Sequence, residues 1–199
     1  MLGNLTFTTA RGPGKVMPMP WKLRLLWYRI DKAALAGALV FALVVGALVS
    51  AAGTVLNLRD AQRAALREFH ARSLECLARN VYYEARGESL AGQYAVAEVT
   101  MNRKASPLYP KTVCAVVYQK NWDPLRRRYV SAFSWTGDDL DAPAGQEWRR
   151  AVKIAEDVYY QRRAPALPGV LHFHATYVRP DWSKDRERVA RIGRHVFYR

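Results

Sequence analysis

Two glutamates four residues apart, Glu84 and Glu88, have the residue type and spacing of a catalytic site. They stand in the stretch VYYEARGESLAGQYAVAEVTMNR, residues 81–103. On one continuous helix, side chains four apart share a face, and the two carboxylates would imitate the ~5.5 Å pair of a retaining glycosidase. Three interpretations are open at this point: a catalytic pair, a single catalytic acid with a structural neighbour, or the solvated end of a helix.

The position of Glu84 favours an acid. We expect a helix over residues 74–85 that stops at Gly87, which puts Glu84 in the last turn. The negative end of the helix dipole disfavours a carboxylate there, and the flanking Tyr82 and Tyr83 reduce its solvation. Both effects raise the pKa above the ordinary value of ~4.3. A proton held near neutrality suits general acid catalysis on a glycosidic oxygen.

Two helices joined by a turn are expected to position these glutamates. Ser73 is a suitable N-cap for the first helix, and a second helix is expected from Ser89 to about Arg103, before the two prolines of KASPLYP. Gly87 breaks the register between the two helices. Glu88 is then left to cap the next helix or to bond a backbone amide.

The remaining segments predict an α+β domain in which helix dominates. The apolar run 111–119 is compatible with a strand or a helix, and 120–145 reads as a long loop. Apolar residues of 146–161 recur at i, i+3, i+4 and i+7, which is typical of a core-facing helix. Short strands and turns are expected over 169–199.

An uncharged apolar segment, 33–58, is long enough to cross a bilayer, which needs about 20 residues. The preceding 1–32 carries six Lys and Arg against one Asp, which predicts a cytoplasmic N-terminus and an exported C-terminal part. A cleaved signal peptide is the alternative, although this apolar stretch exceeds the usual ~7 to 15 residues. The predicted organisation is a basic cytoplasmic segment 1–32, a transmembrane anchor 33–58, a helical stalk 59–72 and a domain over 73–199.

Charge and cysteine content narrow the class of partner and the compartment. The formal net charge is +14, which suits anionic partners, and export makes nucleic acid the least expected of them. The two cysteines, Cys76 and Cys114, both follow the apolar segment. An oxidising compartment favours a disulfide between them, and two buried free thiols are the alternative.

Other chemistries find weaker support. His172, His174 and His195 could hold zinc, but no H-E-x-x-H pattern accompanies them, and core or groove histidines are the expectation. We predict no metal and no cofactor. Neither a G-x-S-x-G nucleophile turn nor a glycine-rich phosphate loop occurs in the sequence.

Aromatic residues concentrate in the segments expected to be loops: Trp122, Tyr129, Phe133, Trp135, Tyr177 and Trp182. Sugar rings stack on such side chains, and sugar hydroxyls need polar neighbours such as Gln93, Asn102 and Gln119. Packing of the same aromatic residues onto a small core is the alternative.

Residues 74–199 resemble the SleB/CwlJ-type cell-wall hydrolases, the spore cortex-lytic group. The resemblance follows the family's order through LARNVYYEARGE, GQYAVAEVTMNR, the run from Pro110 to Gln119, AFSW, LHFH, DW and IGRHVFY. The chain departs from related sequences at Ala132 and Thr136, where many have a second cysteine pair. It also departs in the loop 121–129, which contains three consecutive arginines.

The resemblance implies a lysozyme-like fold and cleavage of peptidoglycan between N-acetylmuramic acid and N-acetylglucosamine. It implies Glu84 as the single catalytic acid of a lytic transglycosylase, whereas attack by water would make the protein a muramidase. The candidate substrate-binding residues are Tyr83, Glu88, Gln93, Asn102, Gln119, Phe133, Trp135, His174 and His195.

The leading hypothesis is therefore a peptidoglycan-cleaving enzyme anchored in the bacterial inner membrane through 33–58, with its domain in the periplasm. Glycan strands of peptidoglycan are the expected partner, and a restraining protein partner is also conceivable. Two other classes stay open. One is a catalytically silent peptidoglycan-binding module, and the other is a zinc amidase built on the three histidines.

Overall fold

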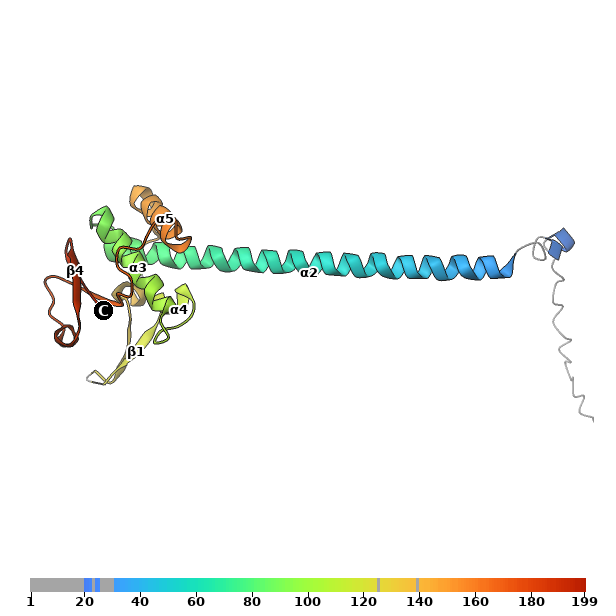
Figure 1. Ribbon diagram of the computed structural model, residues 1–199. Coiled ribbons are helices and arrows are strands. Elements are labelled where there is room, and N and C mark those ends of the chain that lie inside the picture. The colour runs from blue at the N-terminus through green and yellow to red at the C-terminus, as the bar shows by residue number, and fades with distance from the viewer. Residues whose placement is uncertain (1–19, 23, 26–30, 125, 139) are drawn as a thin grey trace, which may run out of the picture. The chain divides into compact units, whose positions relative to one another are not determined.

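The computed structural model describes residues 20–22, 24–25, 31–124, 126–138 and 140–199. Most of the predicted basic segment 1–32 therefore lies outside the described residues. The chain divides into two compact units, Met1–Asp60 and Ala61–Arg199. The helices and strands are labelled in Figure 1.

One 54-residue helix, α2 (Lys32–Ala85), contains the apolar segment. In the first unit its large apolar side chains are exposed, among them Leu39, Phe41 and Leu43. By length and composition this stretch is a candidate membrane span, and none of its most apolar window is buried. A signal sequence close to the N-terminus would meet the same criteria.

The expected N-cap at Ser73 is wrong, because α2 continues through it. No proline interrupts the sequence between Lys32 and Ala85, so the helix can propagate from turn to turn. Ser73 instead begins a buried face that Leu77, Asn80 and Val81 continue at four, seven and eight residues further along. This face joins the end of α2 to the core of the second unit.

Helix α3 (Leu90–Ala105) begins where the sequence predicts. The Ser89 hydroxyl accepts a hydrogen bond from the Gly92 amide at 3.3 Å, which satisfies one of the amides that a helix start leaves unpaired. Its buried residues include Val96, Val99 and Thr100, so one face packs into the core. The second helix is confirmed, and the structure adds that Ser89 is its N-cap.

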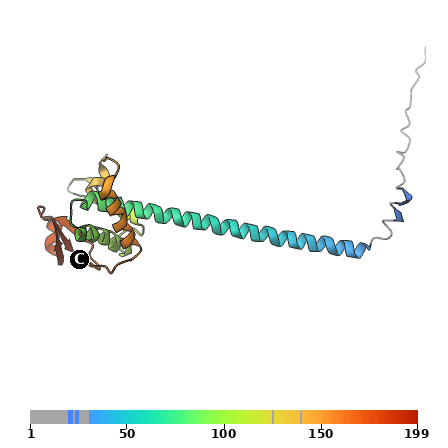
Figure 2. The same ribbon diagram turned by 90° about the horizontal axis from the view of Figure 1, so that it is seen from above.

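Two further helices complete the helical layer. The apolar run 111–119 forms the short helix α4 (Val113–Val117), with Thr112 as its N-cap, which resolves the choice between strand and helix. Helix α5 (Gly145–Tyr159) buries Ala151, Ile154, Ala155 and Val158, as its spacing predicts. It packs against α3, as Figure 2 also shows.

A disulfide joins α2 to α4. The Sγ atoms of Cys76 and Cys114 are bonded, and their Cα atoms are 5.2 Å apart. The bridge closes a loop with a sequence separation of 38. The predicted pairing is confirmed.

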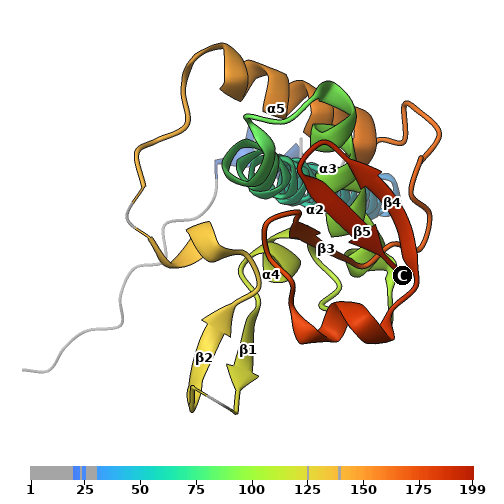
Figure 3. The same cartoon turned by 90° about the vertical axis from the view of Figure 1, so that its left-hand side faces the viewer.

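The strands form two small antiparallel sheets (Figure 3). The first is a hairpin of β1 (Lys120–Asp123) and β2 (Arg128–Ser131), which is followed by the 3-10 helix η1 (Ser134–Gly137). The expected loop over 120–145 is therefore wrong for the hairpin, whose strands are too short and too polar to show an alternating pattern.

The second sheet has the order β3-β5-β4. It contains β3 (His172–Ala175), β4 (Arg188–Ile192) and β5 (His195–Tyr198). The 3-10 helix η2 (Asp181–Asp185) lies between β3 and β4 in the sequence. Phe197 is fully buried and packs in a cluster with Ala95 and Val99 of α3, which fixes the sheet to the helices. The second unit is thus α+β with helix dominant, as predicted.

Candidate active site

A cavity of about 380 Å³ opens beside the end of α2. The residues that line it come from α2, α3, the segment after β2, the segment from β3 onward, and β5: Tyr83, Glu84, Arg103, Ala132, Phe133, Ser134, Phe173, His174, Ala175, Tyr177, Val178 and His195. Glu84 is the one carboxylate among these described lining residues. The cavity therefore presents a single acidic group to whatever enters it.

The carboxyl group of Glu84 holds its proton near neutrality. Burial raises its pKa from 4.5 to about 7, and the positive charge of Arg103 opposes that rise without cancelling it. Glu84 is half-buried in the last turn of α2, as the sequence predicts. A protonated carboxyl that lines a cavity can donate its proton to an oxygen of a bound molecule.

Arg103 is the cation that faces Glu84, and it is almost fully buried. Its Nε donates a hydrogen bond to the carbonyl oxygen of Leu171 at 2.7 Å, and its guanidinium lies over the rings of Tyr109 and Phe133. Burial lowers the pKa of Arg103 but leaves a strong base that stays charged. These contacts fix a positive charge on one side of the cavity.

Glu88 is not part of the cavity lining, and Arg194 engages both of its carboxylate oxygens. Oε2 accepts from the Arg194 amide at 3.0 Å and Oε1 accepts from its Nε at 2.7 Å. Burial acts to raise the pKa of Glu88, but the hydrogen bonds and charge of Arg194 outweigh it, and the pKa is lowered. Glu88 bonds a backbone amide, which is one of the two roles expected for it.

Two glycines make room for this ion pair. A Cβ on Gly193, whose φ is +56°, would collide with Oε2 of Glu88. A Cβ on Gly87 would lie 3.1 Å from Nη2 of Arg194. Gly87 does not adopt a left-handed conformation, since the positive-φ glycines are Gly145, Gly169 and Gly193 among the described residues. A side chain at position 87 would therefore press on the end of the Arg194 side chain.

Two histidines line the cavity, and they differ in their hydrogen-bond partners. His174 Nδ1 lies 2.9 Å from the carbonyl oxygen of Ala175, and its Nε2 lies 2.9 Å from the hydroxyl of Tyr198. Because a carbonyl only accepts, Nδ1 carries the hydrogen, and in the neutral ring Nε2 accepts from Tyr198. His195 is buried, and its Nδ1 has no partner among the described residues. Burial lowers the pKa of His195, which favours the neutral ring.

The three histidines do not form a metal site. Both ring nitrogens of His174 are already engaged, and His172 faces Trp182 at a ring distance of 5.5 Å. No three metal-binding side chains come together anywhere in the described part of the chain.

Tyr83 forms part of one wall and packs against Trp135. Their rings are stacked with centroids 4.7 Å apart. The Tyr83 hydroxyl donates to the carbonyl oxygen of Asp141 at 2.6 Å, and the Trp135 indole donates to Asn80 Oδ1 at 3.0 Å. Of the pair, Tyr83 lines the cavity and Trp135 supports it from behind.

Three predicted polar contacts lie outside the cavity lining. Gln93 donates to the carbonyl oxygen of Glu88, and Asn102 donates to those of Leu167 and Val170. Gln119 donates to the side chain of Asn121. Each side chain holds a turn or loop of the fold, so the cavity geometry lends no support to a substrate contact.

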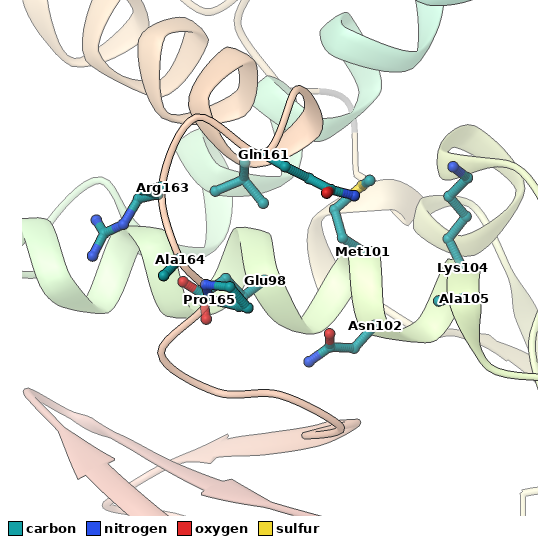
Figure 4. Close-up of a pocket in the computed structure, with 10 residues that line it drawn as sticks. Glu98, Met101, Asn102, Lys104, Ala105, Gln161, Arg163, Ala164 and Pro165 are labelled. Atoms are coloured by element: carbon teal, nitrogen blue, oxygen red, sulfur yellow. The ribbon is translucent and has the colours of Figure 1, made fainter.

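A larger cavity of about 530 Å³ lies elsewhere on α3 and contains none of the residues around Glu84 (Figure 4). One of its walls is Glu98, which is almost fully buried. Glu98 Oε2 accepts hydrogen bonds from the amides of Ala166 and Leu167, and Oε1 has no partner among the described residues. This carboxylate ties a loop to α3.

Sequence reasoning missed Arg103 as a member of the site. A signal was present, because Val96, Val99, Thr100 and Arg103 follow the i, i+3, i+4, i+7 spacing of a buried helix face. A charged residue on that face is expected to have a partner in the interior, since an unpaired buried charge is costly.

Comparisons of sequence extend this description. The family model described as Cell Wall Hydrolase matches residues 87–198. The spore cortex-lytic enzyme of Bacillus subtilis is 32% identical over 130 residues, which are 65% of this chain and 38% of that protein. The enzyme of the same name from Halalkalibacterium halodurans is 32% identical over 125 residues, 62% of this chain and 34% of that protein. The matched region thus spans little more than a third of these relatives.

Solved structures give similar matches. The catalytic domain of the germination-specific lytic transglycosylase SleB from Bacillus anthracis is 26% identical, with 64% of this chain and 93% of that chain covered and a TM-score of 0.49. The catalytic domain of the Bacillus cereus SleB protein is 24% identical, with 64% and 89% covered and a TM-score of 0.45. The family model spans more than half of the 199 residues, and the curated relatives that match the chain are spore cortex-lytic enzymes. The chain belongs to the cell wall hydrolase family.

Proposed function

We propose that this protein is a peptidoglycan-cleaving glycosidase that acts on the bond between N-acetylmuramic acid and N-acetylglucosamine as a lytic transglycosylase. The observation that carries the proposal is Glu84, a carboxyl group with a pKa of about 7 that lines a cavity in a member of the cell wall hydrolase family. A lysozyme-like arrangement of the domain is part of the same proposal.

The reaction uses one carboxyl group twice. Glu84 first donates its proton to the glycosidic oxygen, and the bond from that oxygen to C1 of the muramoyl sugar breaks with its electron pair. The positive charge that develops at C1 is captured by the O6 hydroxyl of the same sugar. Glu84, now a carboxylate, takes the O6 proton, which closes the 1,6-anhydro ring and restores the acid.

The absence of a second carboxylate from the described lining supports this route over a two-carboxylate mechanism. A retaining enzyme places its nucleophile ~5 to 5.5 Å from the acid, and an inverting enzyme places its base ~6.5 to 9.5 Å away. Glu88, the nearest carboxylate in sequence, is held by Arg194. The internal O6 hydroxyl needs no such partner, because Glu84 serves as acid and then as base.

The test is digestion of purified sacculi by wild-type protein and by Glu84→Gln, with mass spectrometry of the soluble products. We expect anhydro-muropeptides from the wild type and a loss of at least 100-fold in the variant, within the usual range for general acid catalysis. Glu147→Gln, an exposed glutamate in the first turn of α5, is the matched control and should be unaffected. Undiminished release by Glu84→Gln would remove Glu84 as the acid.

The products also separate the alternatives. Reducing-end muropeptides would indicate attack by water and a muramidase, and free peptides would indicate an amidase. A wild-type protein that binds sacculi and releases nothing would be a silent binding module.

The location belongs to the same proposal. Residues 33–58 anchor the protein in the bacterial inner membrane, and the domain from about residue 73 onward acts on peptidoglycan in the periplasm. The apolar, exposed character of this part of α2 supports an anchor. The disulfide supports an oxidising compartment for the domain.

A further inference from the structure

The β1–β2 hairpin carries an aromatic pair that the core does not use. Trp122 and Tyr129 lie directly opposite each other in the strand register, with ring centroids 5.3 Å apart. The two residues are 54% and 67% exposed. Exposed aromatic rings cost hydration and offer apolar faces to a ligand.

The same hairpin carries an excess of positive charge. Its residues 120–131 include four cations, Lys120 and Arg126 to Arg128, against the single carboxylate of Asp123. Asp123 pairs with Arg126 at 2.8 Å. Arg127 and Arg128 are exposed and form no ion pair with any described residue. Their guanidinium groups are therefore available to carboxylates of a partner.

The hairpin is continuous with the wall of the Glu84 cavity. Strand β2 ends at Ser131, and the next three residues, Ala132 to Ser134, line the cavity. The Ala132 amide donates to the carbonyl oxygen of Gln119 at 2.8 Å, which extends the pairing of the two strands up to that wall. Figure 3 shows the hairpin projecting from the body of the domain.

From these observations we propose that the hairpin is a second contact surface for the peptidoglycan strand whose cleavage is proposed above. The rings of Trp122 and Tyr129 stack on a sugar outside the cavity, and Arg127 and Arg128 pair with carboxylates of the stem peptides. The partner is thus a glycan that still bears its peptides. This inference rests on the proposed function, because it takes peptidoglycan as the ligand.

Binding is measured in the Glu84→Gln background, so that the ligand is not consumed, by cosedimentation of the protein with purified sacculi. Two double variants test the two contacts: Trp122→Ala with Tyr129→Ala, and Arg127→Glu with Arg128→Glu. Arg149→Glu with Arg150→Glu makes the same change of charge on the exposed face of α5 and is the matched control. Circular dichroism confirms that each variant is folded.

We expect both hairpin variants to bind sacculi more weakly by on the order of tenfold, and the control to bind like its parent. Added salt should reduce the difference between the arginine variant and its parent, because screening weakens charge pairs at an exposed surface. Equal binding by all four proteins would overturn the proposal, as would a loss in the control as large as in the arginine variant.

A second ligand assigns the role of the arginines. On sacculi whose carboxylates have been capped as amides, the arginine variant should bind like its parent while the aromatic variant stays weak. A persistent arginine effect on capped sacculi would refute carboxylate pairing. If the hairpin variants lost binding only to vesicles containing phosphatidylglycerol, the surface would be a membrane contact and the proposal would fail.

Failure of this inference and failure of the proposed function give different results. If Glu84→Gln abolishes digestion and the hairpin variants bind and digest sacculi normally, the hairpin proposal alone is wrong. If Glu84→Gln digests sacculi undiminished, the proposed catalytic acid is wrong whatever the hairpin does.

Discussion

The proposed role of Glu84 as the catalytic acid predicts how the activity depends on pH. The proposed reaction needs its protonated form, and the pKa of the carboxyl is about 7. We therefore expect kcat/KM for sacculus digestion to fall as the pH rises through about 7, since kcat/KM reports ionisations of the free enzyme. Turbidity assays between pH 5 and 9 measure this. A rate that rises through pH 7 would contradict the assignment.

Arg103 provides an internal control for that profile. Its charge lowers the pKa of Glu84, so replacing it with methionine should move the falling limb to higher pH. Arg103→Lys retains the charge and should keep the limb near its original position. Both variants remove the Nε–H group that donates to Leu171, so a limb that shifted equally in both would point to structural damage.

The same raised pKa predicts a pH dependence of stability. The carboxyl of Glu84 has a pKa of about 7 when folded and 4.5 as its reference. Below pH 4.5 both states are protonated and nothing is lost. As the pH rises from 4.5 through 7, the unfolded state releases its proton first, so the free energy of unfolding decreases, by at most roughly 3 kcal/mol.

Removal of the titrating group should abolish this loss. Glu84→Gln is expected to be more stable than wild type at pH 8 and similar to it at pH 4, as measured by urea unfolding. A variant that is equally stabilised at both pH values would show that burial of the ionised carboxylate is not the cause.

At the level of elements, the turn between β4 and β5 is held by Glu88 through Arg194. Gly193→Ala would place a Cβ in the left-handed region and against the Glu88 carboxylate. Gly169→Ala, at φ +73°, meets only ordinary contacts with Arg199 and is the matched control. The control should cost about 1 to 2 kcal/mol of unfolding free energy, and Gly193→Ala clearly more. Equal losses of unfolding free energy would show that the turn or the Glu88 side chain can move to relieve the collision.

An element can be predicted from the sequence when its residues show a helix cap or a regular apolar spacing. Helices α3 and α5 carry caps or regular apolar spacing and were predicted nearly to their ends. The β1–β2 hairpin has short polar strands without such a pattern and reads as a loop. Serine is a residue type that often caps a helix, but Ser73 lies inside α2 because its side chain belongs to a buried face of that helix.

The candidate site follows a similar rule. Glu84 was predicted from its place at a helix end together with the family resemblance, and Phe133, His174 and His195 join it in the cavity lining. Gln93 instead satisfies a carbonyl oxygen of the fold, a pairing across space that the sequence does not display. Arg103 is recognised once its helix face is known to be buried.

At the scale of the whole molecule, the two units should separate in function. A protein beginning at Ala61, where the second compact unit starts, should remain soluble without detergent and should digest isolated sacculi. The reason is that the exposed apolar side chains of 33–58 are gone while the Glu84 cavity is intact. Sedimentation with membranes and a digestion assay, beside the full chain, measure the two outcomes. Loss of digestion by a folded fragment would contradict this division.

The disulfide should contribute to the stability of the second unit. Closing a loop with a separation of 38 residues is worth about 4 kcal/mol in the chain-entropy model. Reduction, or Cys76→Ser with Cys114→Ser, should therefore lower the melting temperature by many degrees. Calorimetry with and without a reductant measures this, and the serine variant, which cannot respond to reductant, is the control. An unchanged melting temperature would show that the disulfide does not stabilise the fold by restricting the unfolded chain.

The loop closed by Cys76 and Cys114 contains both Glu84 and Arg103, so the acid and its opposing cation share one covalent ring. Under the proposed location, a chain that has not yet reached the oxidising compartment lacks that ring and with it the stabilisation of the segment that carries Glu84. For the proposed wall-cleaving enzyme, the cysteine pair would thus tie the stability of this segment to arrival in the oxidising compartment where its proposed substrate lies.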